Sequence, residues 1–311
     1  MSPPPLREST LGDITLSVVI PAYNYANTLE RAVHSVTQQL ASHHELIVID
    51  DGSTDDTPAI MDRLAQEGLN NTRFIRQNNG GAASARNRGI VEAQGAWLLF
   101  LDADDELIPE ALGHLDDHIS LHPSTRMIIG GHTSVFPNGK TKQHLPAPLP
   151  ADPLEKLRAY LLDKQIVLCN GACAMHKEIF TLGNYPESFR SAEDIPVFAQ
   201  ALANVPCTIL PCALARIFKH DDSLRHQFSH AKSGGTRLVD EIFSTNRLPA
   251  HFHALKNAYF VQRCLSLFRS AYLAEDWEAA KHFFRQALQR DKKTLLKIAY
   301  LRKAARLWIQ H

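Results

Sequence analysis

The sequence predicts an α/β protein in which a mostly parallel sheet is flanked by helices and followed by a C-terminal helical extension. Residues 16–20, 45–49 and 97–101 are nearly continuous runs of Val, Ile, Leu and Phe, which is typical of strands buried on both faces. Segments with the apolar spacing of helices separate these runs, as in β-α-β units. Beyond about residue 235 the apolar pattern is helical to the end.

The elements of the first 120 residues alternate regularly. Residues 1–13 are polar and rich in Pro, so we expect an N-terminal tail before the first strand. A helix is expected after the strand at 16–20, because apolar residues recur at intervals of four, three and four from Leu29 to Leu40. Thr57 and Pro58 resemble an N-cap and a first helical residue. The remaining elements are expected as a strand at 73–75, a helix at about 82–93, the strand at 97–101 and a helix that begins near Pro109.

This alternation ends at about residue 126. Pro137-Asn138-Gly139 predicts a hairpin turn, and a Pro-rich segment follows at 145–153. A helix is expected at 194–203, and short strands at 208–210 and 213–218. The chain therefore divides into a tail at 1–13, one α/β domain at 14–235 with halves at 14–120 and 121–235, and a helical extension at 236–311.

The composition excludes several classes of protein. With 44% hydrophobic residues, the chain is not predicted to be disordered. Its 33 Lys and Arg are balanced by 33 Asp and Glu, so the chain as a whole is not basic enough to bind nucleic acid through its net charge. The five cysteines form no C-x-x-C pair and are odd in number, so we expect reduced thiols. The sequence has no signal-peptide pattern and no apolar run of membrane-spanning length, so we expect a cytoplasmic protein.

Polar clusters follow three of the expected strands, at residues 21–24 (PAYN), 50–55 (DDGSTD) and 102–105 (DADD). Ligands bind at the carboxyl ends of strands in open parallel sheets, and clustered carboxylates there favour a bound divalent metal. The glycine-rich phosphate motifs of nicotinamide enzymes and P-loop NTPases are absent from the sequence. A helix entrance rich in Gly and Ala, at residues 79–89, instead places Arg86 near the ligand.

Four segments carry a resemblance to a known family: LSVVIPAYN, LIVIDDGSTDDT, NNGGAASARNRGI and LLFLDADD. In this order and spacing they resemble the nucleotide-binding half of the inverting glycosyltransferases of family 2, which have the GT-A fold. A weaker likeness continues through residues 191–194 (SAED) and His220. The resemblance makes residues 14–120 the nucleotide-binding half and 121–235 the acceptor half, and it suggests bacterial enzymes of envelope polysaccharide or lipopolysaccharide assembly.

The resemblance implies the donor-binding residues. Pro21 and Tyr23 would lie at the base, with Tyr23 as a stacking surface. Asp51 would accept a hydrogen bond from N3–H of uracil or thymine, which favours a UDP- or dTDP-sugar, although the N1–H of guanine leaves GDP-sugars open. Arg86 would also belong to the nucleotide site.

The DADD segment would hold the metal. Asp104 would coordinate Mn²⁺ or Mg²⁺ at the diphosphate, Asp102 would support the ribose or metal-bound water, and Asp105 is a competing ligand. His220 matches the position of a histidine near the metal in many relatives.

Asp194 is the expected general base that takes the proton of the acceptor hydroxyl during a single displacement with inversion. Glu193 is the alternative base, or an acid that stabilises the helix N-terminus. These roles predict a metal-dependent inverting glycosyltransferase whose acceptor is a glycan or a lipid-linked glycan.

Two other functions stay open at this stage. A haloacid-dehalogenase-like phosphatase also begins with a D-x-D segment after a strand, but it expects Thr or Val where this chain has Glu106. A catalytically inactive relative could bind a nucleotide sugar or a glycan as a scaffold.

The C-terminal tail is basic. Residues 290–311 carry seven Lys and Arg and one Asp, a net charge of +6, so residues 1–289 carry −6. An apolar stripe at Leu295, Ile298, Leu301, Ala305 and Trp308 predicts an amphipathic helix. Such a helix either binds an anionic membrane surface through residues 291–311, at the inner face of the cell membrane, or packs its stripe on the domain. His43, His44 and the other scattered histidines are expected to be structural or solvated.

Overall fold

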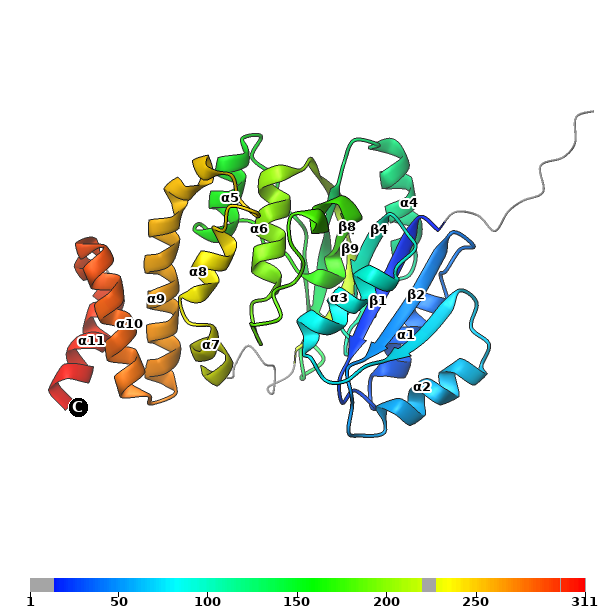
Figure 1. Ribbon diagram of the computed structural model, residues 1–311, viewed down its shortest axis with the longest axis horizontal. Coiled ribbons are helices and arrows are strands. Elements are labelled where there is room, and N and C mark those ends of the chain that lie inside the picture. The colour runs from blue at the N-terminus through cyan, green and yellow to red at the C-terminus, as the bar shows by residue number, and fades with distance from the viewer. Residues whose placement is uncertain (1–13, 220–227, 297, 311) are drawn as a thin grey trace, which may run out of the picture.

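The computed structural model describes residues 14–219, 228–296 and 298–310, and these form one sheet between two helical layers with a helical extension at one end (Figure 1). The strands are β1 (Leu16–Ala22), β2 (His44–Asp50), β3 (Thr72–Arg76), β4 (Trp97–Phe100), β5 (Glu106–Leu107), β6 (Met127–Val135), β7 (Thr141–His144), β8 (Cys173–His176) and β9 (Cys207–Phe218).

The sheet order is β3-β2-β1-β4-β8-β6-β9-β5, with β7 paired to β6. The first four strands of this order are parallel, and β6 is parallel to β9. β8 is antiparallel to both β4 and β6, and it joins the two parallel groups. The carboxyl ends of β1, β2 and β4 therefore lie side by side, which brings the three polar clusters of the sequence to one edge.

Helices cover both faces of the sheet. The helices beside the sheet are α1 (Leu29–Thr37), α2 (Thr57–Gln66), α3 (Ala82–Glu92), α4 (Ala111–Leu121), α5 (Pro153–Leu161) and α6 (Asp194–Asn204), with 3₁₀ turns η1 (Asn170–Ala172) and η2 (Lys177–Thr181). The next helix, α7 (Phe228–Gly234), packs with the C-terminal helices. Val18 of β1 packs with α1, α2 and α4, whereas Val19 packs with α3 and α6 on the other face. This alternation explains why β1 is apolar at successive positions.

The extension comprises α8 (Arg237–Ile242), η4 (Ala250–Leu255), α9 (Lys256–Leu273), α10 (Trp277–Arg290), η5 (Lys292–Leu296) and α11 (Ile298–Gln310). α8 and η4 pack with α5 and α6 in one apolar cluster, and α9, α10 and α11 share a second. α9 to α11 lie at the opposite end of the long axis from α2 and β2 (Figure 1). No helix among the described residues is long and apolar enough to cross a membrane.

Most expected elements are confirmed, including the hairpin between β6 and β7 and the helical extension. Two details of the prediction are wrong. Asp56, not Thr57, is the N-cap residue of α2, because the Thr57 hydroxyl accepts a hydrogen bond from the Tyr25 N–H instead (2.8 Å). The two strands expected at 208–210 and 213–218 are one strand, β9, whose pairing with β6 continues across an irregularity near Gly131. The cysteines are free thiols, as expected.

Candidate functional site

The end of β1 provides one buried and one exposed residue of the expected base site. Pro21 is buried within β1, in register with Ile49 of the neighbouring strand. Tyr23 follows the strand and is 44% exposed. An exposed aromatic ring beside a buried strand end is a suitable stacking surface for a nucleotide base.

Side-chain hydrogen bonds join the loops after β1 and β2. The Asn24 N–H donates to Ser53 Oγ (2.9 Å), and Asn24 Oδ1 accepts from the Thr54 N–H (2.8 Å). The Ala26 N–H donates to Asp55 Oδ2 (3.1 Å). These bonds fix the two loops relative to each other before any ligand binds.

Asp51 is 2% exposed and is held by the segment that leads into α3. Its Oδ1 accepts hydrogen bonds from Gln77 Nε2 (2.7 Å) and the Gly80 N–H (2.9 Å), and its Oδ2 accepts from the Gly81 N–H (2.6 Å). A carboxylate can accept about four hydrogen bonds, so these three donors leave capacity for one more. The sequence did not indicate that Asp51 also organises this loop.

Glycine is required at two positions beside Asp51 where the chain turns. Gly81 has a φ of +94°, and a Cβ at this position would lie 2.3 Å from Nη1 of Arg190. The exposed Arg190 therefore lies directly against the loop that binds Asp51. Gly52 has a φ of +73°, and its Cβ would lie 2.8 Å from the backbone nitrogen of Asn79.

Three carboxylates follow β4 and differ in accessibility. Asp105 is buried, and its Oδ1 accepts a hydrogen bond from the Phe218 N–H (2.9 Å). Burial, together with the charges of Asp102 and Asp104, raises the pKa of Asp105 to about 9. The side chain of Asp102 is 43% exposed, and Asp104 is partly exposed. Arg31 Nη2 donates to the backbone carbonyl of Asp104 (2.6 Å), which anchors the turn.

These residues fit a divalent cation. Carboxylate oxygens are the ligands that Mn²⁺ and Mg²⁺ prefer, and Asp102 and Asp104 present them at the accessible edge of the sheet. Burial is the main cause of the raised pKa of Asp105, and the negative charges of Asp102 and Asp104, which such a cation would neutralise, add to it. Because the Asp105 carboxylate is buried and bonded to Phe218, Asp102 and Asp104 are the better ligands.

Arg86 of α3 connects the two halves of the α/β domain. Its Nη2 donates to Asp102 Oδ1 (2.8 Å), and its Nη1 donates to Glu193 Oε1 (2.7 Å). Burial disfavours the charged guanidinium, but the carboxylates of Asp102 and Glu193 outweigh this effect and raise the pKa of Arg86. The guanidinium also lies 5.4 Å from the centre of the Tyr185 ring. Arg86 is thus an internal ion-pair partner rather than a surface arginine.

Asp194 is the first residue of α6 and follows directly on Glu193, the partner of Arg86. Burial, and then the charge of Glu193, raise the pKa of Asp194 to about 6, although the nearby Arg86 opposes this. Burial, and to a smaller extent the negative charge of Asp194, raises the pKa values of three tyrosine hydroxyls, those of Tyr160, Tyr185 and Tyr259. A carboxylate with a pKa near neutrality can accept a proton during a reaction.

The backbone before this pair is strained. Ala192 has a φ of +63°, a conformation that residues with a Cβ rarely adopt. Such outliers persist where the surrounding structure holds them, and they often occur at functional sites. The Arg86–Glu193 ion pair is one contact that holds this segment in place.

The structure therefore brings most of the sequence-predicted residues to one edge of the sheet. Pro21, Tyr23, Asp51, Asp102 and Asp104 lie at the ends of β1, β2 and β4, and Arg86 links this group to Asp194. His220 lies outside the described residues. Arg190 and the partnership of Glu193 with Arg86 were not predicted, because no local motif relates residues 107 positions apart.

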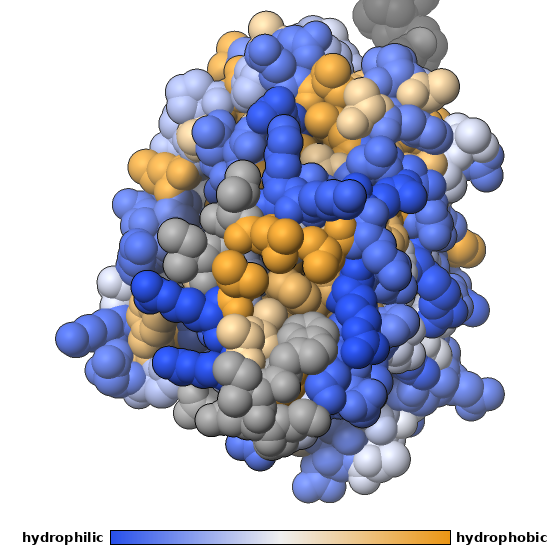
Figure 2. All heavy atoms as spheres, turned by 90° about the vertical axis from the view of Figure 1, so that its left-hand side faces the viewer, coloured by the Kyte–Doolittle hydropathy of each residue, from blue (hydrophilic) through white to orange (hydrophobic). Residues whose placement is uncertain are grey.

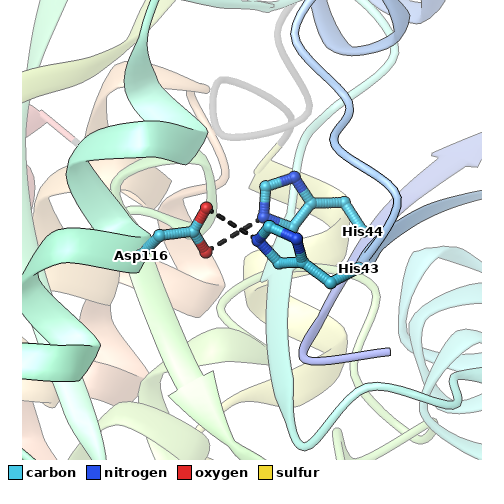
Figure 3. Close-up of side chains that lie close together, drawn as sticks. All are labelled: His43, His44 and Asp116. Carbon is cyan, nitrogen blue, oxygen red and sulfur yellow. Dashed lines mark hydrogen bonds and ion pairs between the residues drawn. The ribbon is translucent and has the colours of Figure 1, made fainter. Parts of the chain in front are cut away.

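Two groups of side chains among residues 14–219, 228–296 and 298–310 are close enough to share a metal, and neither includes a residue of the polar clusters after β1, β2 and β4. In the first, His43 Nε2 and His44 Nε2 each lie 3.0 Å from a different oxygen of Asp116 (Figure 3). His44 Nδ1 accepts a hydrogen bond from the Ala41 N–H (3.1 Å), so its Nε2 carries the ring hydrogen and donates it to Asp116. A protonated nitrogen is not a metal ligand. His43 and His44 therefore connect the start of β2 to α4, in the structural role that was expected.

The second group consists of Glu30, His34 and Glu67. Both oxygens of Glu30 accept hydrogen bonds from the Arg63 guanidinium (2.8 and 2.9 Å), and these side chains are about half exposed. This group is a solvated ion-pair cluster between α1 and α2.

The chain is similar to known proteins in sequence and in fold. The model of a family described as Glycosyl transferase family 2 matches residues 17–182, more than half of the chain. The chain is 40% identical over 91 residues to a Bacillus subtilis (strain 168) protein described as putative teichuronic acid biosynthesis glycosyltransferase TuaG, covering 29% of this chain and 36% of that protein. It is 38% identical over 101 residues to the GalNAc(5)-diNAcBac-PP-undecaprenol beta-1,3-glucosyltransferase of Campylobacter jejuni. This match covers 32% of this chain and 33% of that protein.

These matches are confined to part of each relative. Matches to three further curated glycosyltransferases cover 30%, 27% and 32% of their length. Among solved structures, S. aureus TarS 1–349 in complex with UDP-GlcNAc superimposes with a TM-score of 0.66 at 19% identity, covering 93% of this chain and 88% of TarS. At this identity the likeness shows the fold, and it confirms the expected GT-A-like sheet with C-terminal helices.

Proposed function

The chain belongs to glycosyl transferase family 2, and from this premise we propose that it moves a sugar from a UDP- or dTDP-sugar to a hydroxyl of a glycan, with inversion, in the synthesis of an envelope polysaccharide. Two relatives, one described as a putative glycosyltransferase of teichuronic acid biosynthesis and one as a glucosyltransferase that acts on an undecaprenol-linked glycan, support this setting. The TarS complex with UDP-GlcNAc supports a uridine donor. The family match leaves the phosphatase alternative without support.

The nucleotide-binding half holds the donor. The exposed ring of Tyr23 stacks on the base, and the remaining acceptor capacity of Asp51 receives the base N3–H. The exposed guanidinium of Arg190, against the Gly81 backbone, is placed to attract the diphosphate. This role for Arg190 is part of the proposal and comes from the geometry rather than from a motif.

Asp102 and Asp104 would hold Mn²⁺ or Mg²⁺. Such a cation would supply positive charge that stabilises the leaving nucleoside diphosphate. Arg86 keeps Asp102 in position through the 2.8 Å hydrogen bond to its Oδ1, which leaves the other oxygen of this carboxylate for the ligand site. Arg31 holds the turn that presents Asp104.

Asp194 is the general base. Its carboxylate takes the proton of the acceptor hydroxyl as that oxygen forms a bond to the anomeric carbon. The bond from this carbon to the diphosphate breaks on the opposite side, and its electron pair leaves with the nucleotide. Glu193 is less suited to this role, because its carboxylate is bonded to Arg86 and is largely buried. Glu193 is instead a positioning residue that fixes the start of α6.

The observation that carries the proposal is the link made by Arg86. One buried guanidinium contacts Asp102, at the metal site, and Glu193, directly beside the base. This link ties the group that binds the leaving diphosphate to the group that activates the acceptor. Fixed relative positions of this kind are what a single displacement requires.

The test compares Asp194→Asn with wild type in nucleotide release from a panel of UDP- and dTDP-sugars with glycan acceptors. We expect Asp194→Asn to lower kcat by about 10³-fold, within the range for loss of a general base, while the Kd for UDP stays unchanged. Glu187→Gln, which changes an exposed residue also within residues 121–235, is the matched control and should keep full turnover. Equal turnover of wild type and Asp194→Asn contradicts the assignment.

The same assay separates the enzyme from an inactive scaffold. A scaffold binds UDP in calorimetry but shows no turnover in the wild-type chain across the whole panel. Turnover of the wild type that depends on Asp194 excludes this alternative.

A further inference from the structure

The last helix uses one face to pack against the rest of the extension. Ala304 and Leu307 of α11 are 3% and 1% exposed, and they join the apolar cluster that contains Phe268 of α9 and Phe284 of α10. Lys303 places its Nζ 5.5 Å from the centre of the Tyr272 ring. These contacts hold α11 on the hairpin of α9 and α10.

The stripe that the sequence predicted lies on a different face. Of its described side chains, Leu301 is 39% exposed, Leu295 is 45% exposed and Ala305 is also exposed. Of the two alternatives for this stripe, packing on the protein is therefore wrong for these three residues. α11 begins after a separate 3₁₀ turn, η5, and it packs through a neighbouring set of side chains. Apolar residues thus remain uncovered at this end of the molecule.

Basic residues accompany these apolar side chains. Arg302 and Arg306 are exposed and one helical turn apart on α11, and Lys292 and Lys293 of η5 are exposed as well. The sequence of α11 contains no acidic residue. We call Leu295, Leu301 and Ala305, with Arg302, Arg306, Lys292 and Lys293, the tail face. Figure 2 views the molecule from this end and shows apolar side chains gathered in the middle of the surface with hydrophilic ones around them.

We propose that the tail face docks the protein on an anionic lipid surface. Exposed leucines beside a row of cations are the composition of helices that lie in the membrane interface, where the apolar side chains enter the acyl boundary and the cations pair with anionic headgroups. The charge is concentrated, since residues 290–311 carry +6 and the remainder of the chain carries −6. The acidic remainder is repelled by an anionic surface, so the charge distribution orients the molecule with its C-terminal end toward the lipid.

Docking on a lipid surface would bring a glycosyltransferase close to a lipid-linked acceptor. An acceptor carried by a lipid is confined to the membrane surface, and docking confines the enzyme to the same surface. The docking inference rests on the exposed side chains of the tail face and does not depend on the identity of the donor or acceptor.

The experiment measures co-sedimentation of the full chain with vesicles. One set contains equal parts phosphatidylglycerol and phosphatidylcholine, and the other contains phosphatidylcholine alone. We expect binding to the anionic set only, and weaker binding at high salt because salt screens the charges. Arg302→Gln combined with Arg306→Gln should lower the partition coefficient by about tenfold or more, and Leu301→Ser by about threefold or more.

Matched variants remove similar groups from other exposed surfaces. Lys140→Gln combined with Lys142→Gln takes two cations from the β6–β7 hairpin, and Leu121→Ser takes an exposed leucine from the end of α4. Both should bind vesicles like wild type, and thermal unfolding should confirm that every variant is folded. Equal binding to the two vesicle sets, or equal effects of tail-face and control variants, overturns the proposal. Concentration-dependent dimers that Leu301→Ser abolishes, without vesicle binding by wild type, would mean instead that a second copy covers this face.

Discussion

Residues 14–120 and residues 121–235 hold the carboxylates of the proposed site in different ways. Asp51 receives three hydrogen bonds, all from residues 77–81 of its own half. Asp194 lies beside the like charge of Glu193, and the positive charge of Arg86, from residues 14–120, opposes the rise in its pKa. The first arrangement fixes a hydrogen-bond acceptor in place, and the second poises a carboxylate to take up a proton.

Arg86→Met should have the largest effect, because Arg86 connects the surroundings of the two carboxylates. The change leaves Glu193 without its buried partner and releases Asp102, so we expect the free energy of unfolding to fall by about 3 kcal/mol. Urea denaturation measures this loss. The matched control is Arg88→Met on the same helix, whose exposed i,i+4 pair with Glu92 contributes only about 0.3–0.5 kcal/mol. Equal losses in the two variants would show that Arg86 does not join the halves.

The pH dependence of turnover tests whether Asp194 takes up a proton. Asp194 must be ionised to accept a proton, so with its pKa raised to about 6, kcat should fall about tenfold for each pH unit below that value. Glu193→Gln removes the neighbouring charge that raises this pKa and should shift the acidic limb to lower pH. A profile that is flat from pH 7 to pH 5, or a limb that does not move in Glu193→Gln, contradicts the role of Asp194.

The loop that holds Asp51 is tested by Gly81→Ala. The φ of +94° is strained for alanine, and the new Cβ would meet the Arg190 guanidinium, so we expect a loss of about 1–3 kcal/mol in unfolding free energy and weaker UDP binding. Gly113→Ala is the control, because this position lies within α4 with open space around it. Alanine there should stabilise the chain by about 0.5–1 kcal/mol.

The smallest effect concerns the histidine contacts at the start of β2. Asp116→Asn removes the carboxylate that accepts hydrogen bonds from His43 and His44, and it should cost about 1 kcal/mol near pH 8 in denaturation. Burial lowers the pKa of His44, so the folded state favours the neutral ring. Stability should therefore decline as the pH falls through the ordinary histidine range near 6.5. Asp117→Asn, at the neighbouring exposed position, should have no effect.

The sequence predicts the fold of residues 14–120 well because its determinants are local. Strands that are apolar at successive positions end in polar clusters, and parallel pairing alone brings Asp51 and Asp102 to one edge. Neither the contact between Arg86 and Glu193 nor that between Arg190 and Gly81 follows from periodicity, because each depends on how α3 packs beside the segment before α6.

The tail shows a second limit of sequence reasoning. Helical spacing identified an amphipathic stripe at Leu301 and Ala305, but the structure buries Ala304 and Leu307 instead. Both sets have apolar members at helical intervals. Only the packing partners on α9 and α10 decide which set is covered.

The most direct test of the account is calorimetric binding of UDP, dTDP, GDP and CMP, each with Mn²⁺ and with EDTA. We expect UDP or dTDP to bind with Mn²⁺, and this binding to weaken at least about tenfold with EDTA or in Asp104→Ala, since the carboxylates after β4 would hold the cation at the diphosphate. CMP should bind more weakly, because cytosine has no N3–H for Asp51. Binding of UDP that is unchanged by EDTA and by Asp104→Ala, or absence of binding by any nucleotide, would contradict a metal-dependent nucleotide-sugar site at this edge of the sheet.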